Sequence, residues 1–440
     1  MRAWLSYAWY RLKASLWLVP SLMMTCAIVL SFVTVWLDVR FSIPALADPD
    51  GQFFIGPDGS RELLSTIAGS MISVASLVFS ITLVVLQLAS SQLGPRLVSR
   101  FTQDRVNQIV LGTFLATFLY ALLVLRAVTG SDEEAFVPHI SVVTAVLLAI
   151  VSLLWLVYFI HHVAETIQAD TVIAEVSDDI RRSIGRMFPG IELSPGQLAS
   201  GALPPLARIA EDPGEIRLQI TGYIQAIDVQ AILETAVEHD LIMELRHRPG
   251  HFVVAGAVAA MVWPRSALTD KITRSVRRSI VIGYRRTPTQ DVEFAISSLV
   301  QIALRALSPS INDPITAVTC IDRLSATLAE LMQRPPPPSQ IPDAAGEIRL
   351  LVHPTTFEGA IDAAFNDIRQ SSGGQVRALI RLIEALTTLA GRAAIDELRG
   401  PVEKHAEMVA EVCRTTIKDR RDRADAEAAL ARLRQALAGE

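Results

Sequence analysis

The chain has 440 residues, of which 51% are hydrophobic, and its formal net charge is −5 at a sequence pI near 6.0. That balance argues against a protein that binds nucleic acid through a basic surface. Residues 1–164 hold only nine basic and nine acidic side chains, whereas residues 165–440 hold 31 and 36, so a purely soluble protein is excluded.

Four stretches of the first part lack charged residues, and each reaches the roughly 20 residues that a helix needs to cross a bilayer. Basic residues precede the first stretch and separate the second from the third, while the other two loops are acidic. This asymmetry predicts that both termini lie in the cytoplasm and that the lipid bilayer is a partner. We expect a four-helix transmembrane domain of residues 1–164 with spans at about 14–37, 63–95, 106–128 and 138–162.

The second expected span differs from the others because hydroxyl side chains recur along one of its faces. At 100° per residue, one line of that helix contains Thr66, Ser70, Ser73, Leu77, Ser80, Val84 and Gln87. Such a face is costly toward lipid, so it should contact protein or water. Two interpretations stay open: the line packs against another helix, or copies of it line a pore with Leu77 and Val84 as apolar constrictions.

Smaller polar groups occur on the third and fourth spans. Thr113, Thr117 and Tyr120 recur at helical spacing, which favours a helix contact. His161, His162 and Glu165 at the end of the fourth span lack a further neighbouring ligand, and they indicate a membrane-exit boundary or a pH-sensitive cluster rather than a metal site. We expect no metal.

A helix and a Pro/Gly-rich linker are expected over residues 165–212, followed by a small β-rich module over 213–288. Alternating apolar residues and regular turns in the module predict a small β-barrel or sandwich. Residues 249–256 are similar to a hairpin of the biotinyl/lipoyl half-barrel, which implies the same scaffold. Such carriers are modified on lysine, and no lysine lies between Lys13 and Lys271, so we expect no cofactor.

The rest of the second part is predicted to be largely helical. Arg274, Arg277 and Arg278 share a helical face, and they either contact anionic lipid headgroups or pair with acids nearby. A helical hairpin is expected over residues 289–334, with Asp313 as the cap of its second helix before Pro314. A strand near residues 346–353 and further helices are expected in a C-terminal region of residues 339–440. The whole is a membrane protein with four transmembrane helices and an α+β cytoplasmic region.

Three segments have a distinctive sequence: Gly222–Asp228, Thr287–Asp291 and Arg305–Ala317. With Gln87–Arg96 and the third and fourth spans, they resemble an uncharacterised family of predicted bacterial membrane proteins, domain of unknown function 2254. The resemblance covers most of the chain and implies an inner-membrane protein without an established activity. Its motif residues, which we expect to be structural, are Gln290, Asp291, Asn312, Asp313 and Pro314.

The chain contains none of the phosphate-binding, zinc-protease or dinucleotide-binding motifs, and its three cysteines are far apart, so we expect no enzyme and no catalytic residue. A long, hydroxyl-lined span leading into a cytoplasmic region favours a homo-oligomeric, channel-like assembly with a cytoplasmic vestibule. The alternative is a membrane-anchored scaffold or sensor that does not conduct.

Overall fold

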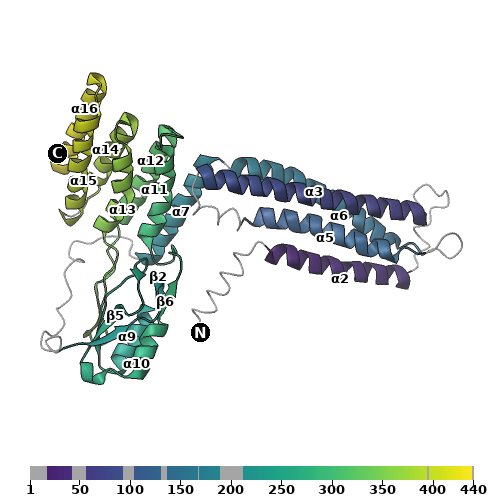
Figure 1. Ribbon diagram of the computed structural model, residues 1–440, viewed down its shortest axis with the longest axis horizontal. Helices are drawn as coiled ribbons and strands as arrows, with labels where there is room; N and C mark the ends of the chain where they lie inside the picture. Colours follow the sequence, from purple (N-terminus) through teal and green to yellow (C-terminus); the bar gives the residue numbers. More distant parts are fainter. Residues whose placement is uncertain are drawn as a thin grey trace. The chain divides into compact units, whose positions relative to one another are not determined.

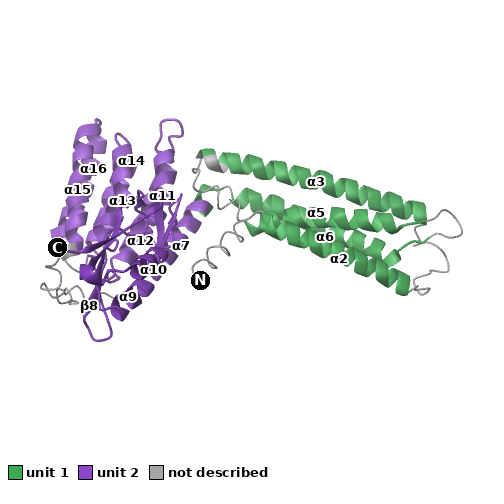
Figure 2. Cartoon of the chain, turned by 60° about the horizontal axis from the view of Figure 1, so that its bottom comes forward, with its two compact units in different colours: residues 1–171 green, residues 172–440 purple. Residues whose placement is uncertain are grey.

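The computed structural model describes residues 17–41, 56–92, 104–129, 136–166, 168–188, 212–393 and 396–438. The chain divides into two compact units, residues 1–171 and residues 172–440 (Figure 2). Of the expected helix and linker over residues 165–212, the helix is described as α7 (Ala169–Met187), while residues 189–211 lie outside the described residues, as do residues 14–16 and 93–95 of the first two expected spans.

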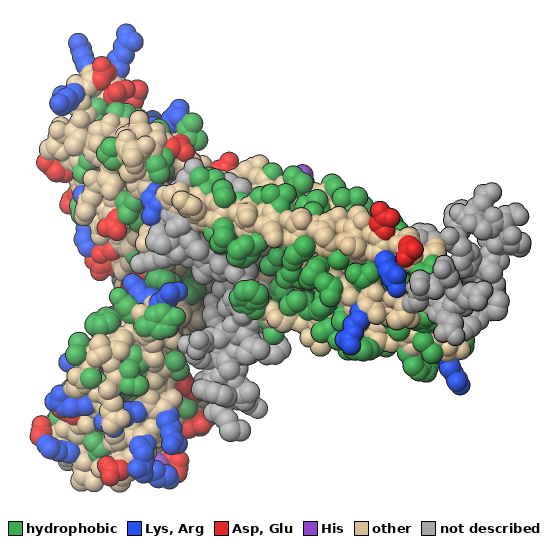
Figure 3. Space-filling model, turned by 45° about the vertical axis from the view of Figure 1, so that its right-hand side comes forward, with side chains coloured by type: hydrophobic (Ala, Val, Ile, Leu, Met, Phe, Trp, Pro, Cys, Tyr) green, Lys and Arg blue, Asp and Glu red, His purple; other side chains and the backbone are tan. Residues whose placement is uncertain are grey.

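The described residues of the first unit contain four helices that are long and apolar enough to cross a membrane, the number that the sequence predicts. In Figure 3, hydrophobic side chains cover much of the surface of the four-helix unit. Charged side chains gather near one end of its helices. At 1.5 Å per residue the 36 residues of α3 extend about 54 Å, well beyond the ~30 Å hydrocarbon layer. The helices are α2 (Leu18–Arg40), α3 (Pro57–Gln92), α5 (Arg105–Ala127) and α6 (His139–Thr166).

Helix α5 packs against α2, α3 and α6 and forms the centre of this unit (Figure 1). Gly112 permits a close approach to α2, because a Cβ there would lie 2.6 Å from the Sδ of Met23. The helix contact predicted for Thr113, Thr117 and Tyr120 is confirmed, since all three are buried. Thr117 bonds Ser152 of α6 at 3.0 Å, and Tyr120 bonds Thr34 of α2 at 2.8 Å.

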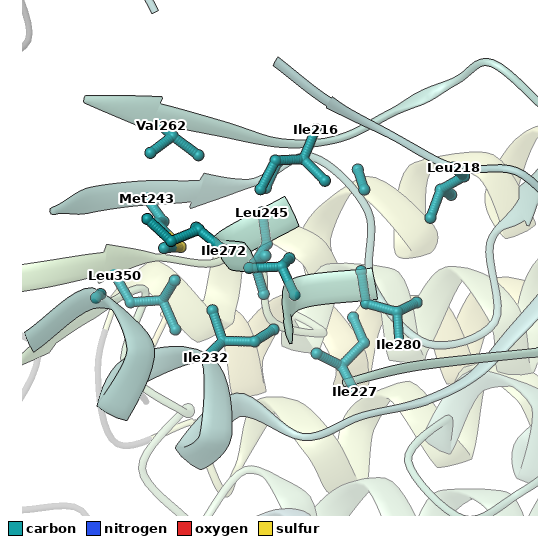
Figure 4. Packing of buried hydrophobic residues seen from close by; sticks show 14 of the residues in the cluster. Ile216, Leu218, Ile227, Ile232, Met243, Leu245, Val262, Ile272, Ile280 and Leu350 are labelled. Carbon is teal, nitrogen blue, oxygen red and sulfur yellow. The ribbon is translucent and has the colours of Figure 1, made fainter. Parts of the chain in front are cut away.

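The second unit contains two sheets. The five-stranded sheet has the order β1-β5-β3-β8-β7 and the three-stranded sheet the order β4-β2-β6. Helices α9 (Val229–Glu238) and α10 (Asp270–Arg278) share a hydrophobic core with them, in which Ile232 and Ile272 face Met243 and Leu350 (Figure 4). The strands are β1 (Gly214–Arg217), β2 (Gly222–Ile227), β3 (Ile242–Leu245), β4 (Phe252–Val253), β5 (Val258–Trp263), β6 (Ile280–Gly283), β7 (Gln340–Pro342) and β8 (Ile348–Leu351).

The sequence predicts a small β-barrel or sandwich, and the structure shows no closed barrel, because the described strands form two open sheets. The five-stranded sheet ends at β1 and β7, which do not pair with each other. Its fourth strand is β8, which pairs in parallel with β3 and corresponds to the strand expected near residues 346–353. β8 follows the helical hairpin in sequence and extends the sheet beyond β3. Helices α9 and α10, rather than further strands, cover the core.

The remaining helices form a separate layer of the second unit (Figure 1). Helix α11 packs on α12 and α13, α12 packs on α14, and α14 packs on α15 and α16. Short 3₁₀ helix η2 (Arg265–Ala267) precedes α10. The helices of the layer and the helix that opens the unit are α7 (Ala169–Met187), α11 (Val292–Ala306), α12 (Pro314–Leu331), α13 (Phe357–Ser371), α14 (Val376–Ala390), α15 (Asp396–Thr416) and α16 (Arg420–Ala438).

Candidate functional site

The polar line of α3 lies on the outside of the four-helix unit. Leu77 is 56% exposed and Val84 is 65% exposed, and the five polar members of the line are also exposed. The opposite side of α3 faces inward, where Ala75 and Val78 pack in one cluster with Phe114 of α5 and Phe159 of α6. No described residue covers the line, so within one chain it serves no helix contact, in contrast to the buried polar line of α5.

The three serine hydroxyls of the line are bonded within their own helix. Ser70, Ser73 and Ser80 donate to the carbonyl oxygens four residues earlier at 2.6, 2.8 and 2.9 Å. Such bonds satisfy the hydroxyl donor and lower the cost of lipid contact. Gln87 is different, because its exposed amide has no hydrogen-bond partner in the part of the chain that the structure describes. Gln87 is therefore the member of the line whose amide a polar neighbour would satisfy.

Carboxylates fix the ends of the neighbouring helices. Asp38 of α2 accepts from the backbone N–H groups of Ile140 and Ser141 at 2.8 and 3.0 Å, and so caps the start of α6. Asp104 caps α5 by accepting from the N–H of Val106 at 2.9 Å, and its other oxygen lies 2.6 Å from Nε2 of His162. The unit that presents the α3 face is therefore fastened at both ends.

The two histidines of α6 have different partners. His162 bonds Asp104, while His161 lies 3.3 Å from Glu165, and the described residues contain no group able to hold a metal ion. The pair of His162 and Asp104 joins the ends of two spans, in agreement with a boundary role.

Gln290 and Asp291 occupy the junction between the three-stranded sheet and α11. The amide of Gln290 accepts from the N–H of Ile227 at 2.9 Å and donates to its carbonyl at 3.3 Å, like a neighbouring strand. Asp291 caps α11 by accepting from the N–H of Phe294 at 2.9 Å. It also receives two hydrogen bonds from Arg286, at 2.8 and 2.9 Å. Asp291 is 1% exposed, and this burial raises its pKa despite those partners.

Gly250 makes room for this ion pair. A Cβ at that position would lie 2.2 Å from an oxygen of Asp291, and the glycine has a φ of +95°, which favours glycine. Beside it, Arg248 donates to Glu293 and to Thr355, both at 2.8 Å. The charges at this junction are mutually paired, so the motif connects the sheets to the helical layer.

Asn312, Asp313 and Pro314 form the turn between α11 and α12. The predicted cap is confirmed: Asp313 accepts from the N–H groups of Ile315 and Thr316, both at 3.1 Å, and from the hydroxyl of Thr316. These hydrogen bonds lower the pKa of Asp313. Asn312 has a left-handed φ of +50° and accepts from the amide of Gln375 at 3.1 Å, which ties the turn to the start of α14.

Variants of Asp313 separate capping from a need for charge. Asp313→Ala is expected to destabilise the protein by roughly 0.5–2 kcal/mol, whereas Asp313→Asn or Asp313→Ser should be nearly silent, because those residues cap about as well. Since the pKa of Asp313 is lowered by folding, its stabilising contribution is present above the unfolded pKa and is lost as the pH falls through the folded one. Melting temperature and oligomeric state provide the measurement. Loss of assembly in Asp313→Asn at unchanged melting temperature would show that the charge is required.

Among the described residues, the three arginines of α10 form no ion pair with the acids nearby in sequence, which are Asp270, Asp291 and Glu293. Asp291 bonds Arg286 and Glu293 bonds Arg248, while Arg277 donates to the carbonyl oxygen of Arg217 at 2.7 Å. Arg274 and Arg278 are exposed and have no acidic partner among the described residues.

A pocket of about 470 Å³ lies between α12, α13 and α15. Two of its charges pair with each other, since Nζ of Lys404 lies 3.1 Å from an oxygen of Glu358. A third, Arg334, bonds Glu330 at 2.7 Å and the carbonyl oxygen of Phe188 at 2.9 Å. Its charged groups are already paired, and we assign it no function.

The structure does not bring the predicted residues into one site. The α3 face belongs to the first unit, and the second holds Gln290 and Asp291 at a sheet junction, Asn312 to Pro314 at a helical turn, and the arginines on α10. Arg286, Arg248 and Gln375 were missed by sequence reasoning. Only Arg286, five residues before Asp291, could have been found from sequence spacing.

Comparison with known proteins finds similarity across both units of the chain. A family model described as "Predicted membrane protein (DUF2254)" matches residues 13–388, a range that includes the α3 face, the arginines and both motifs. Two uncharacterised proteins, Rv1290c of Mycobacterium tuberculosis and Mb1321c of Mycobacterium bovis, are each 31% identical over 373 residues. Each alignment covers 84% of this chain and 71% of the relative. No solved structure matches the chain significantly.

Proposed function

Because the chain belongs to the DUF2254 family of predicted membrane proteins, we propose that it functions in a bilayer as an assembly of identical chains. In this proposal the polar faces of several α3 helices meet around a shared axis in the bacterial inner membrane. The assembly is channel-like, and the second unit forms its cytoplasmic part. It has no catalytic role and needs no cofactor.

One observation carries the proposal: the polar line of α3 faces outward, next to exposed apolar residues such as Phe79 and Leu83, while Ala75 and Val78 pack inward. A helix that faced only lipid on its outer side would turn its polar line inward. Contact with α3 of a second chain gives Gln87 a partner for its amide and lets the small serines pack closely. If the faces surround water instead, Leu77 and Val84 are the apolar constrictions of the path.

Native mass spectrometry of the purified protein tests the assembly. We expect one closed oligomer, and we expect Gln87→Leu to weaken it, because leucine supplies no hydrogen bond across the contact. Leu88→Ala, at an exposed residue beside Gln87, serves as the control and should assemble normally. A monomeric protein under conditions that retain bound lipid would contradict the proposal and would favour a membrane-anchored scaffold or sensor.

The orientation is tested by reporter fusions. Charge asymmetry between the loops predicts that a reporter after Gly439 is cytoplasmic and that one inserted at Gly51 is periplasmic. Both positions lie outside the described residues. Activity of paired phosphatase and fluorescent reporters distinguishes the two sides, and a periplasmic C-terminal reporter would reverse the proposed topology.

A further inference from the structure

An exposed group of apolar side chains gathers at one end of the three-stranded sheet. In the register of β2, Tyr223 lies opposite Phe252 on one side and opposite Gly283 on the other, which brings three loops together. The hydroxyl of Thr221 accepts from the N–H of Ala255 at 3.0 Å and holds two of these loops in contact. The apolar tip, as we call it, consists of Ile220, Phe252, Val254 and Tyr284, which are 60%, 56%, 59% and 77% exposed.

Arginines border the apolar tip. Arg217 donates to the carbonyl oxygen of Gly256 at 2.8 Å, two residues after Val254, and its own carbonyl accepts from Arg277, which connects α10 to the loop that carries Val254. The guanidinium of Arg285 lies 5.0 Å from the ring centre of Tyr284. The charge of Arg217 is paired with that of Glu215. Within the described ranges, Arg274, Arg278 and Arg285 have no acidic partner.

We propose that the apolar tip and its arginines dock onto the surface of an anionic lipid bilayer. Aromatic and aliphatic side chains insert at the boundary between headgroups and acyl chains, while arginines bind the lipid phosphates. Each basic residue near such a surface strengthens association about fivefold. The proposal requires membrane anchoring by the spans, and it does not depend on assembly or conduction.

Charge complementarity selects lipid over a second copy of the chain. If two tips met, their arginines without acidic partners among the described residues would lie close together, and repulsion between like charges would oppose the contact. An anionic bilayer instead neutralises them. Because the spans hold the bilayer close to every chain, weak surface binding is enough to keep the tip docked.

A fluorescent label on the tip of the full-length protein in lipid nanodiscs tests the proposal. Val254→Cys is labelled with an environment-sensitive dye in a Cys26→Ser background, since Cys320 and Cys413 are buried. In discs containing phosphatidylglycerol we expect a blue-shifted emission and a severalfold drop in quenching by iodide. Discs of phosphatidylcholine alone, or about 0.5 M salt, should abolish both effects. A label at Glu427→Cys on exposed α16 is the control and should not respond to lipid.

Charge-reversed variants complete the test. The double variant Arg274→Glu and Arg278→Glu is expected to remove the lipid response, and it should still fold because neither side chain has an acidic partner. Arg432→Glu with Arg434→Glu on α16 makes the same change of charge and should leave the response intact. Equal protection in neutral and anionic discs, protection that disappears with one chain per disc, or no protection in either lipid would each overturn the proposal.

Discussion

Leu77→Ser is expected to raise ion leak through membranes that contain the protein severalfold and to slow growth on overexpression. Leu77 is 56% exposed on the polar face of α3, so in the proposed channel-like assembly the change removes an apolar constriction without disturbing the packing of the unit. A hydroxyl there wets the path between copies, and a dewetted constriction is what blocks ions. Conductance of the purified protein in planar bilayers, compared with the wild type, gives the measurement.

Val78→Ser is the matched control, because it makes a similar change one residue away on the packed side. Val78 is 1% exposed and lies in one cluster with Val110 and Phe114. We expect this variant to lose roughly 1–3 kcal/mol of stability by leaving a void and burying a hydroxyl, with no added leak. If both variants lose stability and neither conducts, the α3 face is a packing surface rather than the lining of a pore.

Of the substitutions proposed here, Asp291→Ala is expected to lower the free energy of unfolding most, by about 3–5 kcal/mol. It leaves Arg286 without its partner and removes the cap of α11. Burial raises the pKa of Asp291, so the complete pair adds little net stability. Removal of one partner is nevertheless costly, since the other charge stays partly buried. Denaturant unfolding of the detergent-solubilised protein measures the effect.

Asp228→Ala provides the comparison for that loss. Asp228 caps α9 by accepting from the N–H of Ala231 at 3.2 Å, and it is exposed with no ion pair among the described residues. Its removal should cost only the ~0.5–2 kcal/mol of a helix cap. Equal losses from the two substitutions would show that the pair of Asp291 with Arg286 contributes nothing beyond the cap.

Local chemistry was enough to predict several elements of this fold. The four spans follow from charge-free stretches longer than the bilayer requires, and the structure has all four. The cap by Asp313 depends only on the next three residues, and it is present. The polar line of α3 follows from helical periodicity, but the side that faces outward is set by packing on α5 and α6, which periodicity does not contain.

Contacts between distant segments could not be read in the same way. The barrel or sandwich predicted for residues 213–288 did not include β8, because β3 pairs with it about a hundred residues later in the chain and a pairing between such distant strands has no local signal. The cap that Asp38 gives to α6, 102 residues away, was equally invisible. The partner of Glu293 is Arg248, 45 residues earlier and next to the turn at Gly250, and sequence spacing does not show this pair.

Disulfide cross-linking along α3 tests the central claim, that identical chains meet through its polar face, most directly. In a Cys26→Ser background, Ser73→Cys lies on the polar line, and Leu154→Cys lies on α6, where Leu154 is 65% exposed. In oxidised native membranes we predict that Ser73→Cys forms covalent dimers and that Leu154→Cys stays monomeric. A monomeric Ser73→Cys together with a cross-linked Leu154→Cys would place the contact between chains on another face and would contradict the account.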